Sequence, residues 1–117
     1  KINQDIKVDN EILKYFNHAH DTINYIIEHK DDKEALSCIS YDYMMGFGYL
    51  IGAWLMSKSK TKASEKLKSG DKDKDFLNAK IISSKFYKLH VLPRVSMHFK
   101  VVTDGSNVVM KTLDSYI

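Results

Sequence analysis

Apolar residues recur at helical spacing from the first helix start signal onward. Asn10 and Glu11 form that signal, because a side-chain oxygen can accept the free N–H groups at a helix N-terminus and a carboxylate suits the helix dipole there. The apolar residues that follow lie three or four positions apart, at Ile12, Phe16, Ala19, Ile23 and Ile26. This spacing predicts an amphipathic helix over residues 10–29. Residues 1–9 have no such pattern, and we expect them to be loosely held.

A second, longer helix is predicted over residues 33–69, with its start at Asp31 or Asp32. No helix breaker other than glycine occurs before Gly70, which we expect to end the helix in the left-handed conformation. The stretch 43–56 is uncharged, but it is shorter than the roughly twenty apolar residues that cross a membrane. We therefore interpret it as the buried central helix of a bundle, and we expect no membrane span.

Two further helices are predicted on either side of Pro93, over residues 73–91 and 94–115. Pro93 has no N–H group and disfavours helix at the preceding residue, so a kink or a break is expected there. The first of these helices has an apolar stripe, which we expect to face the core, at Phe76, Ala79, Ile82, Phe86 and Leu89. Four helices joined by short loops predict an all-α chain folded as an antiparallel four-helix bundle.

Three glycines interrupt the uncharged part of the long helix, and each costs about 1 kcal/mol relative to alanine in a helix interior. Gly48 and Gly52 are four residues apart and therefore lie on one face of the helix. We expect this face to allow the close approach of a neighbouring backbone. A local kink or a close ligand is the alternative explanation.

The composition describes a single ordinary globular domain over residues 1–117, with 44% hydrophobic and 28% charged residues. Arg94 is the only arginine among 18 basic residues, which disfavours sequence-specific binding to nucleic acid. The lone cysteine, Cys38, cannot form an intramolecular disulfide. The chain begins at Lys1 and shows no targeting segment, so we interpret it as a domain excised from a longer cytoplasmic protein.

No set of residues predicts catalysis or metal binding in this chain. His18 and His20 are two residues apart and point to different sides of a helix, and His90 and His98 have no ligand at a suitable spacing. Asp42 and the other carboxylates form no acid–base motif, and no glycine-rich loop follows a strand. We therefore expect no catalytic residue, no cofactor-binding residue and no metal ligand.

Two segments together resemble a known family. The first is YDYMMGFGYLIGAWLM, residues 41–56, and the second contains FLNAK, SKFY and LPR within residues 76–94. They are similar to the C-terminal helical extension found on a subset of acyl-CoA dehydrogenases, whose signature reads K…A-R-F-Y…L-L-P. Ser84 and Lys85 stand where that signature has Ala and Arg. The resemblance extends over roughly residues 10–115, and the spacing within 76–94 is its most specific part.

The resemblance implies a role without chemistry for this chain. In such proteins FAD, the acyl-CoA and the catalytic base belong to the preceding domains of the parent enzyme, an oxidoreductase of fatty acid metabolism. The extension is then a non-catalytic domain that packs against those domains or against a second subunit. The expected partners are therefore the preceding domains and a second copy, most simply in a two-fold dimer.

The resemblance and the residue pattern together indicate a structural signature rather than a reactive site, and its members are Gly48, Gly52, Trp54, Lys80, Phe86, Tyr87 and Pro93. The alternative is that Lys80 and Tyr87 face the substrate tunnel of the parent enzyme. The helix over 33–69 has more apolar surface than one core can cover. This predicts a contact face at Tyr41, Met45 and Tyr49.

Two rival functions are open at this point, one based on the lysines between Lys58 and Lys74 and one on the binding of a thioester. The first rival is a free-standing helical interaction module that binds an acidic partner through this Lys-rich surface. The second is a small binder of CoA thioesters. Since runs of charge are usually solvated helix faces, we favour the dehydrogenase domain over both.

Overall fold

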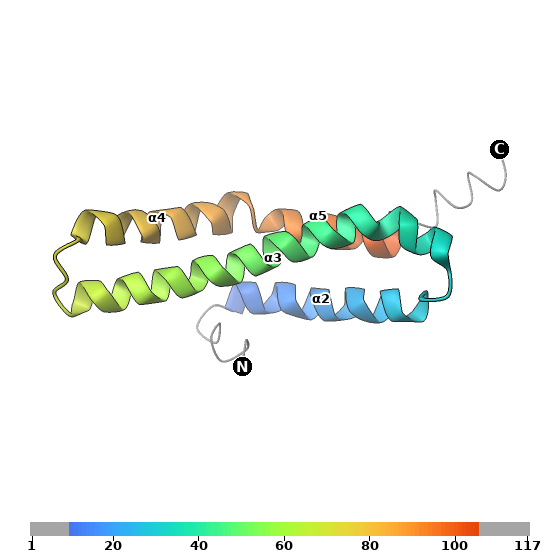
Figure 1. The fold of residues 1–117 in the computed structure, drawn as a ribbon, viewed down its shortest axis with the longest axis horizontal. Coiled ribbons are helices and arrows are strands. Elements are labelled where there is room, and N and C mark those ends of the chain that lie inside the picture. The colour runs from blue at the N-terminus through green and yellow to red at the C-terminus, as the bar shows by residue number, and fades with distance from the viewer. Residues whose placement is uncertain (1–9, 106–117) are drawn as a thin grey trace.

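A computed structural model describes residues 10–105 as helices joined by short turns (Figure 1). The elements are α2 (Asn10–Glu28), α3 (Lys33–Lys68), α4 (Lys74–His90), α5 (Pro93–Lys100) and a π-helical turn η1 (Val101–Gly105). No strand occurs between residues 10 and 105, so the all-α prediction is confirmed. The predicted ranges of the first three helices agree with α2, α3 and α4 to within one residue at each end. Residues 1–9 and 106–117, which include the end of the predicted helix 94–115, lie outside the described residues.

The chain forms three helical rods rather than the predicted antiparallel four-helix bundle. The long helix α3 runs along the whole molecule, α2 lies along one half of it, and α4 lies along the other half (Figure 1). α5 continues beyond the end of α4 and lies beside α3 in the half that contains α2. The reason is that the chain bends at Pro93 without reversing its direction, so α4 and α5 together make one rod.

The junction between α4 and α5 is a break of two residues, Val91 and Leu92. The N–H groups of both residues donate to the carbonyl of Tyr87, at 2.8 and 2.9 Å. Pro93 then starts α5, where its missing N–H group would have no intrahelical partner in any case. The sequence allowed either a kink or a break at Pro93, and in the structure α4 and α5 are separate helices that meet at a break.

Two sequence signals set the ends of α3 as predicted. The side chain of Asp32 accepts a hydrogen bond from the N–H of Ala35 at 3.0 Å and so caps the first turn. Gly70 has a φ of +83°, the left-handed conformation expected after a helix C-terminus. The N–H of Asp71 reaches back to the carbonyl of Lys66 at 3.1 Å and satisfies one of the last helical acceptors.

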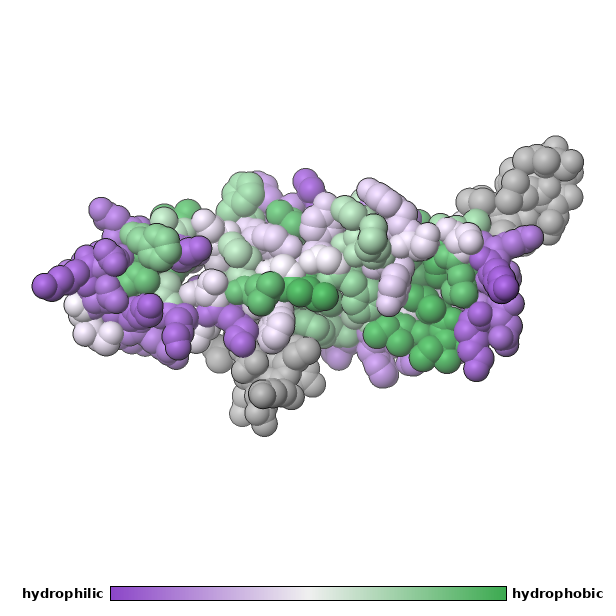
Figure 2. Space-filling model, in the orientation of Figure 1, coloured by the Kyte–Doolittle hydropathy of each residue, from purple (hydrophilic) through white to green (hydrophobic). Residues whose placement is uncertain are grey.

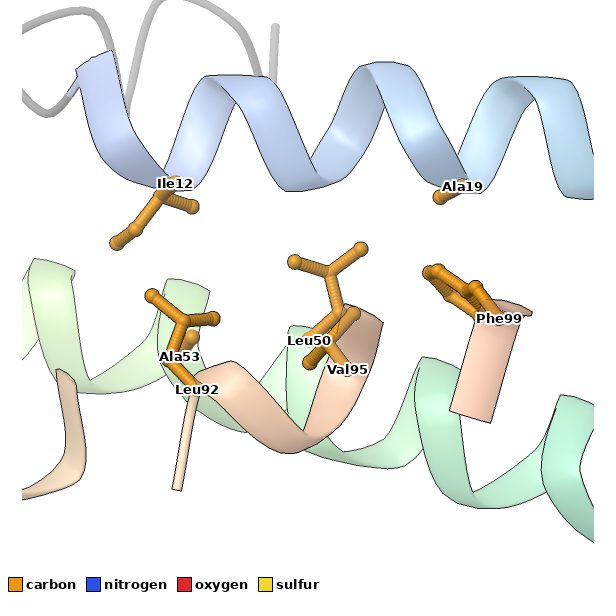
Figure 3. Close-up of a cluster of buried hydrophobic side chains, with 7 residues drawn as sticks. All are labelled: Ile12, Ala19, Leu50, Ala53, Leu92, Val95 and Phe99. Atoms are coloured by element: carbon orange, nitrogen blue, oxygen red, sulfur yellow. The ribbon is translucent and has the colours of Figure 1, made fainter. Parts of the chain in front are cut away.

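The main core lies where all three rods run side by side. Figure 3 shows side chains from α2, from α3 and from the Leu92–α5 segment meeting between the rods. Phe99 and Val95 have no exposed surface, and Leu50 has almost none. The cluster consists of Ile12, Ala19, Leu50, Ala53, Leu92, Val95 and Phe99.

The apolar stripe of α4 faces solvent, which corrects the prediction that it faces the core. Phe76, Ile82, Phe86 and Leu89 are between 58% and 73% exposed. The residues of α4 that are buried instead are Leu77 and Ser84. The spacing had correctly placed the apolar side chains on one face of a helix, but periodicity does not determine which way that face points.

Candidate functional site

A hydrogen bond from Tyr87 joins α4 to the centre of α3. The Tyr87 hydroxyl donates to the carbonyl of Tyr49 at 2.6 Å, and the hydroxyl end of the phenol occupies the position that a Cβ on Gly52 would take. Burial raises the pKa of the Tyr87 phenol above its ordinary value, and the nearby Tyr49 raises it further. The hydroxyl is thus engaged inside the chain, while Lys80 is exposed and extends over the ring of Phe76 at 5.3 Å. These two side chains do not converge on one site.

A pair that the sequence did not predict joins α3 to α5. His98 Nδ1 lies 2.7 Å from a carboxylate oxygen of Asp42, and His98 is only 6% exposed. The ring of Tyr49 stacks on the imidazole at a centroid distance of 5.7 Å, and Tyr41 meets it edge-on at 6.1 Å. Since aromatic rings and helices enclose the pair, we assign it to holding α5 on α3. The two residues are 56 positions apart, and no short-range pattern could have linked them.

The three central glycines of α3 have different surroundings. A Cβ on Gly46 would lie 2.5 Å from the ring of Phe99, and a Cβ on Gly52 would meet Tyr87. Gly48 is exposed, and among residues 10–105 no atom beyond its chain neighbours and the backbone of its own helix turns lies within 4 Å of its Cβ position. The predicted close approach therefore does not occur at Gly48 within the described chain. Where it does occur, the neighbour is an aromatic side chain rather than a backbone.

The remaining signature residues lie in separate places. Trp54 is partly buried against the main core, its Nε1 is enclosed without a hydrogen-bond partner among the described residues, and the Lys58 ammonium lies 5.0 Å from its ring centroid. Phe86 is exposed and stacks on His90 with centroids 4.4 Å apart. Pro93 is exposed at the start of α5. These residues do not form one pocket.

The predicted contact face, Tyr41, Met45 and Tyr49, is only partly exposed to solvent. Tyr41 is 60% exposed, but Met45 and Tyr49 are partly buried, and the Arg94 guanidinium lies 5.9 Å from the Tyr49 ring centroid. Met44, Ile51 and Leu55 are also exposed, by 50–62%, and lie at helical spacing from Tyr41 rather than from Met45 and Tyr49. A second set of exposed apolar side chains, here named the α4–α5 outer stripe, consists of Ile82, Phe86 and Leu89 of α4, Met97 of α5 and Val101 at the start of η1.

The Lys-rich flank lies at the turn between α3 and α4. Hydrophilic surface gathers at this end of the molecule (Figure 2). A groove of about 550 Å³ runs beside the flank and carries both signs of charge, because its lining includes Lys60, Lys68, Lys88, Glu11 and Glu65. The Lys88 ammonium lies 3.8 Å from a Glu11 oxygen. A groove of mixed charge does not select for an acidic partner.

The described residues contain no cluster of histidine, cysteine and carboxylate side chains that could hold a metal ion. Among the helices of residues 10–105, none is long and apolar enough to cross a membrane. The features that remain are therefore contacts between helices and exposed apolar faces.

Comparison with known proteins supports the family resemblance described above. One family model, described as "Acetyl-CoA dehydrogenase C-terminal like", matches residues 8–112. Searches of curated proteins and of solved structures find no significant match. The family match covers nearly the whole chain and confirms the resemblance seen in residues 41–56 and 76–94. The chain belongs to the acetyl-CoA dehydrogenase C-terminal-like family.

Proposed function

We propose that this chain is the non-catalytic C-terminal domain of an FAD-dependent acyl-CoA dehydrogenase and that it packs against the preceding domains of that enzyme. The observation that carries the proposal is the α4–α5 outer stripe. Its five apolar side chains are between 40% and 73% exposed, and three of them, Ile82, Phe86 and Leu89, lie on one face of α4 at steps of four and three residues. Large exposed apolar side chains that gather on one face of a helix usually mark a contact.

The spacing of the stripe suits a helical partner. The apolar residues of α4 that face outward lie at steps of three and four, at Ala79, Ile82, Phe86 and Leu89. This is the alternation that packs one helix along another. The inner face of α4 buries little by comparison, since its buried residues are Leu77 and Ser84. The helix therefore has more apolar surface to bury outside the described chain than inside it.

The central glycines of α3 do not form a phosphate site for FAD. A glycine-rich phosphate site uses free N–H groups in a loop or at a helix N-terminus. Gly46, Gly48 and Gly52 lie in the middle of α3, where the N–H groups are bonded within the helix. In this proposal the flavin and the reacting acyl-CoA are held by the preceding domains, and this chain contributes no step to the reaction.

The first test is the coding sequence upstream of Lys1, which should encode about 450 residues of flavoenzyme, an estimate from three domains of ordinary size. A reading frame that encodes no flavoenzyme upstream would contradict the proposal. The purified 117-residue chain should also retain no yellow flavin and oxidise no acyl-CoA.

The second test examines docking in the complete enzyme. Leu89→Glu places a charge in the α4–α5 outer stripe, and Asn24→Glu on the exposed side of α2 is the matched control. Burying a charge at a contact costs at least about 1.4 kcal/mol, which is a factor of ten in the docking equilibrium. In limited proteolysis of the complete enzyme, Leu89→Glu should therefore increase the rate at which this domain is cleaved from the preceding domains about tenfold. Equal release rates for the two variants would show that the stripe is not the docking surface.

A further inference from the structure

Gly48 lies in the middle of α3 and is exposed, and no neighbour in the described part of the chain occupies the space of its missing side chain. A glycine within a helix loses more conformational entropy on folding than alanine does. Gly46 and Gly52 offset this cost inside the chain, because the rings of Phe99 and Tyr87 occupy the space that a Cβ would fill. No such contact occurs at Gly48 among the described residues. A close approach from outside the chain would explain the glycine.

The residues that share a face with Gly48 are apolar and exposed. We name this surface the α3 outer face, and it consists of Tyr41, Met44, Gly48, Ile51 and Leu55. The four side chains other than glycine are between 50% and 62% exposed. Successive members are three, four, three and four residues apart, the spacing of a helix that packs along a second helix. Figure 2 shows a hydrophobic strip over the middle of α3, with hydrophilic surface at both ends of the molecule.

We propose that the α3 outer face binds the same face of a second copy of this chain, with the two α3 helices antiparallel and a two-fold axis at Gly48. This inference rests on the proposed function only in treating the chain as a contact domain, and it names a different surface and a different partner from the α4–α5 outer stripe. In a two-fold contact the same residues serve both partners. Glycine at the crossing lets the two backbones come closer than two leucine-lined helices can.

The charges at the two ends of α3 favour the antiparallel direction. Residues 28–34 carry four acidic side chains and two lysines, whereas residues 58–68 carry five lysines and one glutamate. A two-fold axis at Gly48 brings residues at equal distances on either side of it together. Glu34 of one copy then lies beside Lys62 of the other. A parallel pair would instead place the two acidic ends beside each other and the two basic ends beside each other, which is unfavourable. The crossing itself, residues 43–57, is uncharged in either direction.

Sedimentation equilibrium of the 117-residue chain tests the association. We expect a dimer at micromolar concentration, and Ile51→Glu and Gly48→Leu should each raise its dissociation constant at least tenfold. Leu89→Glu is the matched control, because it places the same charge on the α4–α5 outer stripe and should leave the dissociation constant unchanged. Circular dichroism verifies that the variants remain helical. A chain that stays monomeric, or a dimer that Leu89→Glu dissociates and Ile51→Glu does not, would overturn the proposal.

Cross-linking tests the direction of the pair. In a Cys38→Ser background, one chain carries Ser37→Cys and the other Ser59→Cys, both at exposed positions equally far from Gly48. A short bismaleimide should join the two unlike chains and should not join two Ser37→Cys chains. Linkage mainly between two Ser37→Cys chains would show a parallel pair and contradict the proposal. The outcome does not depend on flavin or on the preceding domains, so failure here is distinguishable from failure of the proposed function.

Discussion

The two halves of α3 differ in how many helices cover them. In the first half α2 and α5 both lie beside α3, and side chains from all three rods meet around Phe99, Val95 and Leu50. In the second half α4 is the one described helix that lies along α3, with the first residues of α2 at its border, and the buried side chains of the described residues there include Ala63, Leu77 and Ser84. The same helix is thus part of a true core at one end and of a two-helix hairpin at the other.

The difference shows what each half needs from outside the chain. A side chain enclosed by three rods loses nearly all of its contact with water, whereas a side chain between two rods keeps an open side. The hairpin half cannot bury the apolar residues of α4, and it exposes Phe76, Ile82, Phe86 and Leu89. We infer that the three-rod half supplies the enclosed core that stabilises the fold, whereas exposed apolar side chains occur in both halves, among them Ile27 and Met44 in the three-rod half.

The largest expected difference between the halves is for phenylalanine. Phe99→Ala removes a ring with no exposed surface and should lower the free energy of unfolding by about 3–5 kcal/mol. Phe86→Ala removes a ring from the hairpin half that is 58% exposed, and in the isolated chain it should cost less than about 0.5 kcal/mol. Urea denaturation measures both. Equal losses would show that the two halves are equally well packed.

The next effect concerns the glycine that accommodates Phe99. Gly46→Ala places a methyl group 2.5 Å from that buried ring, and the neighbouring core side chains leave the ring little room to move. We expect a loss of about 1–3 kcal/mol from overpacking, measured by urea denaturation. No loss would indicate that the core around Phe99 is loose.

A smaller effect is expected at Tyr87, where the α4–α5 rod meets α3. Tyr87→Phe removes the hydrogen bond to the Tyr49 carbonyl and should cost about 0.5–1.5 kcal/mol at neutral pH. The pKa of Tyr87 is raised in the folded chain, so the folded state holds this proton more strongly than the unfolded state does. The resulting stability is present below the ordinary tyrosine pKa of 10.0 and is lost as the pH rises through the folded pKa.

The pH dependence provides the control for this hydrogen bond. Other tyrosines also titrate at alkaline pH, so the informative quantity is the difference between the original chain and Tyr87→Phe from pH 9 upward. This difference should shrink as the pH increases, because the original chain loses a contribution that the variant lacks. If the difference in free energy of unfolding stays constant with pH, the pKa of Tyr87 is not raised in the folded chain, and its hydroxyl is exposed to water.

The smallest effect has the opposite sign. Gly48→Ala should raise the free energy of unfolding by up to about 1 kcal/mol when the chain is dilute enough to be monomeric, because alanine favours the helix and nothing lies near its methyl group. Thermal unfolding of the dilute chain measures the change. A loss of stability under these conditions would show that another part of the chain contacts Gly48.

Local signals in the sequence were sufficient for the helices and their ends. Asp32 predicted the start of α3, Gly70 its end and Pro93 the interruption of the third rod, because capping, left-handed backbone and a missing N–H group act over only a few residues. The family resemblance could be inferred for the same reason, since its motifs consist of short spacings. The number of rods could not be inferred from local signals, because the direction in which the chain continues after Pro93 depends on what α5 packs against.

The tertiary structure alone decided which residues far apart in the chain contact one another. Periodicity placed Ile82, Phe86 and Leu89 on one face but could not show that this face points to solvent. It also could not distinguish Gly46, against which the Phe99 ring of α5 packs, from Gly48, against which no side chain of residues 10–105 packs. Likewise Asp42 and His98 meet only because α5 returns along α3. A sequence pattern reports the period of one helix, whereas burial depends on which other helix lies beside each face.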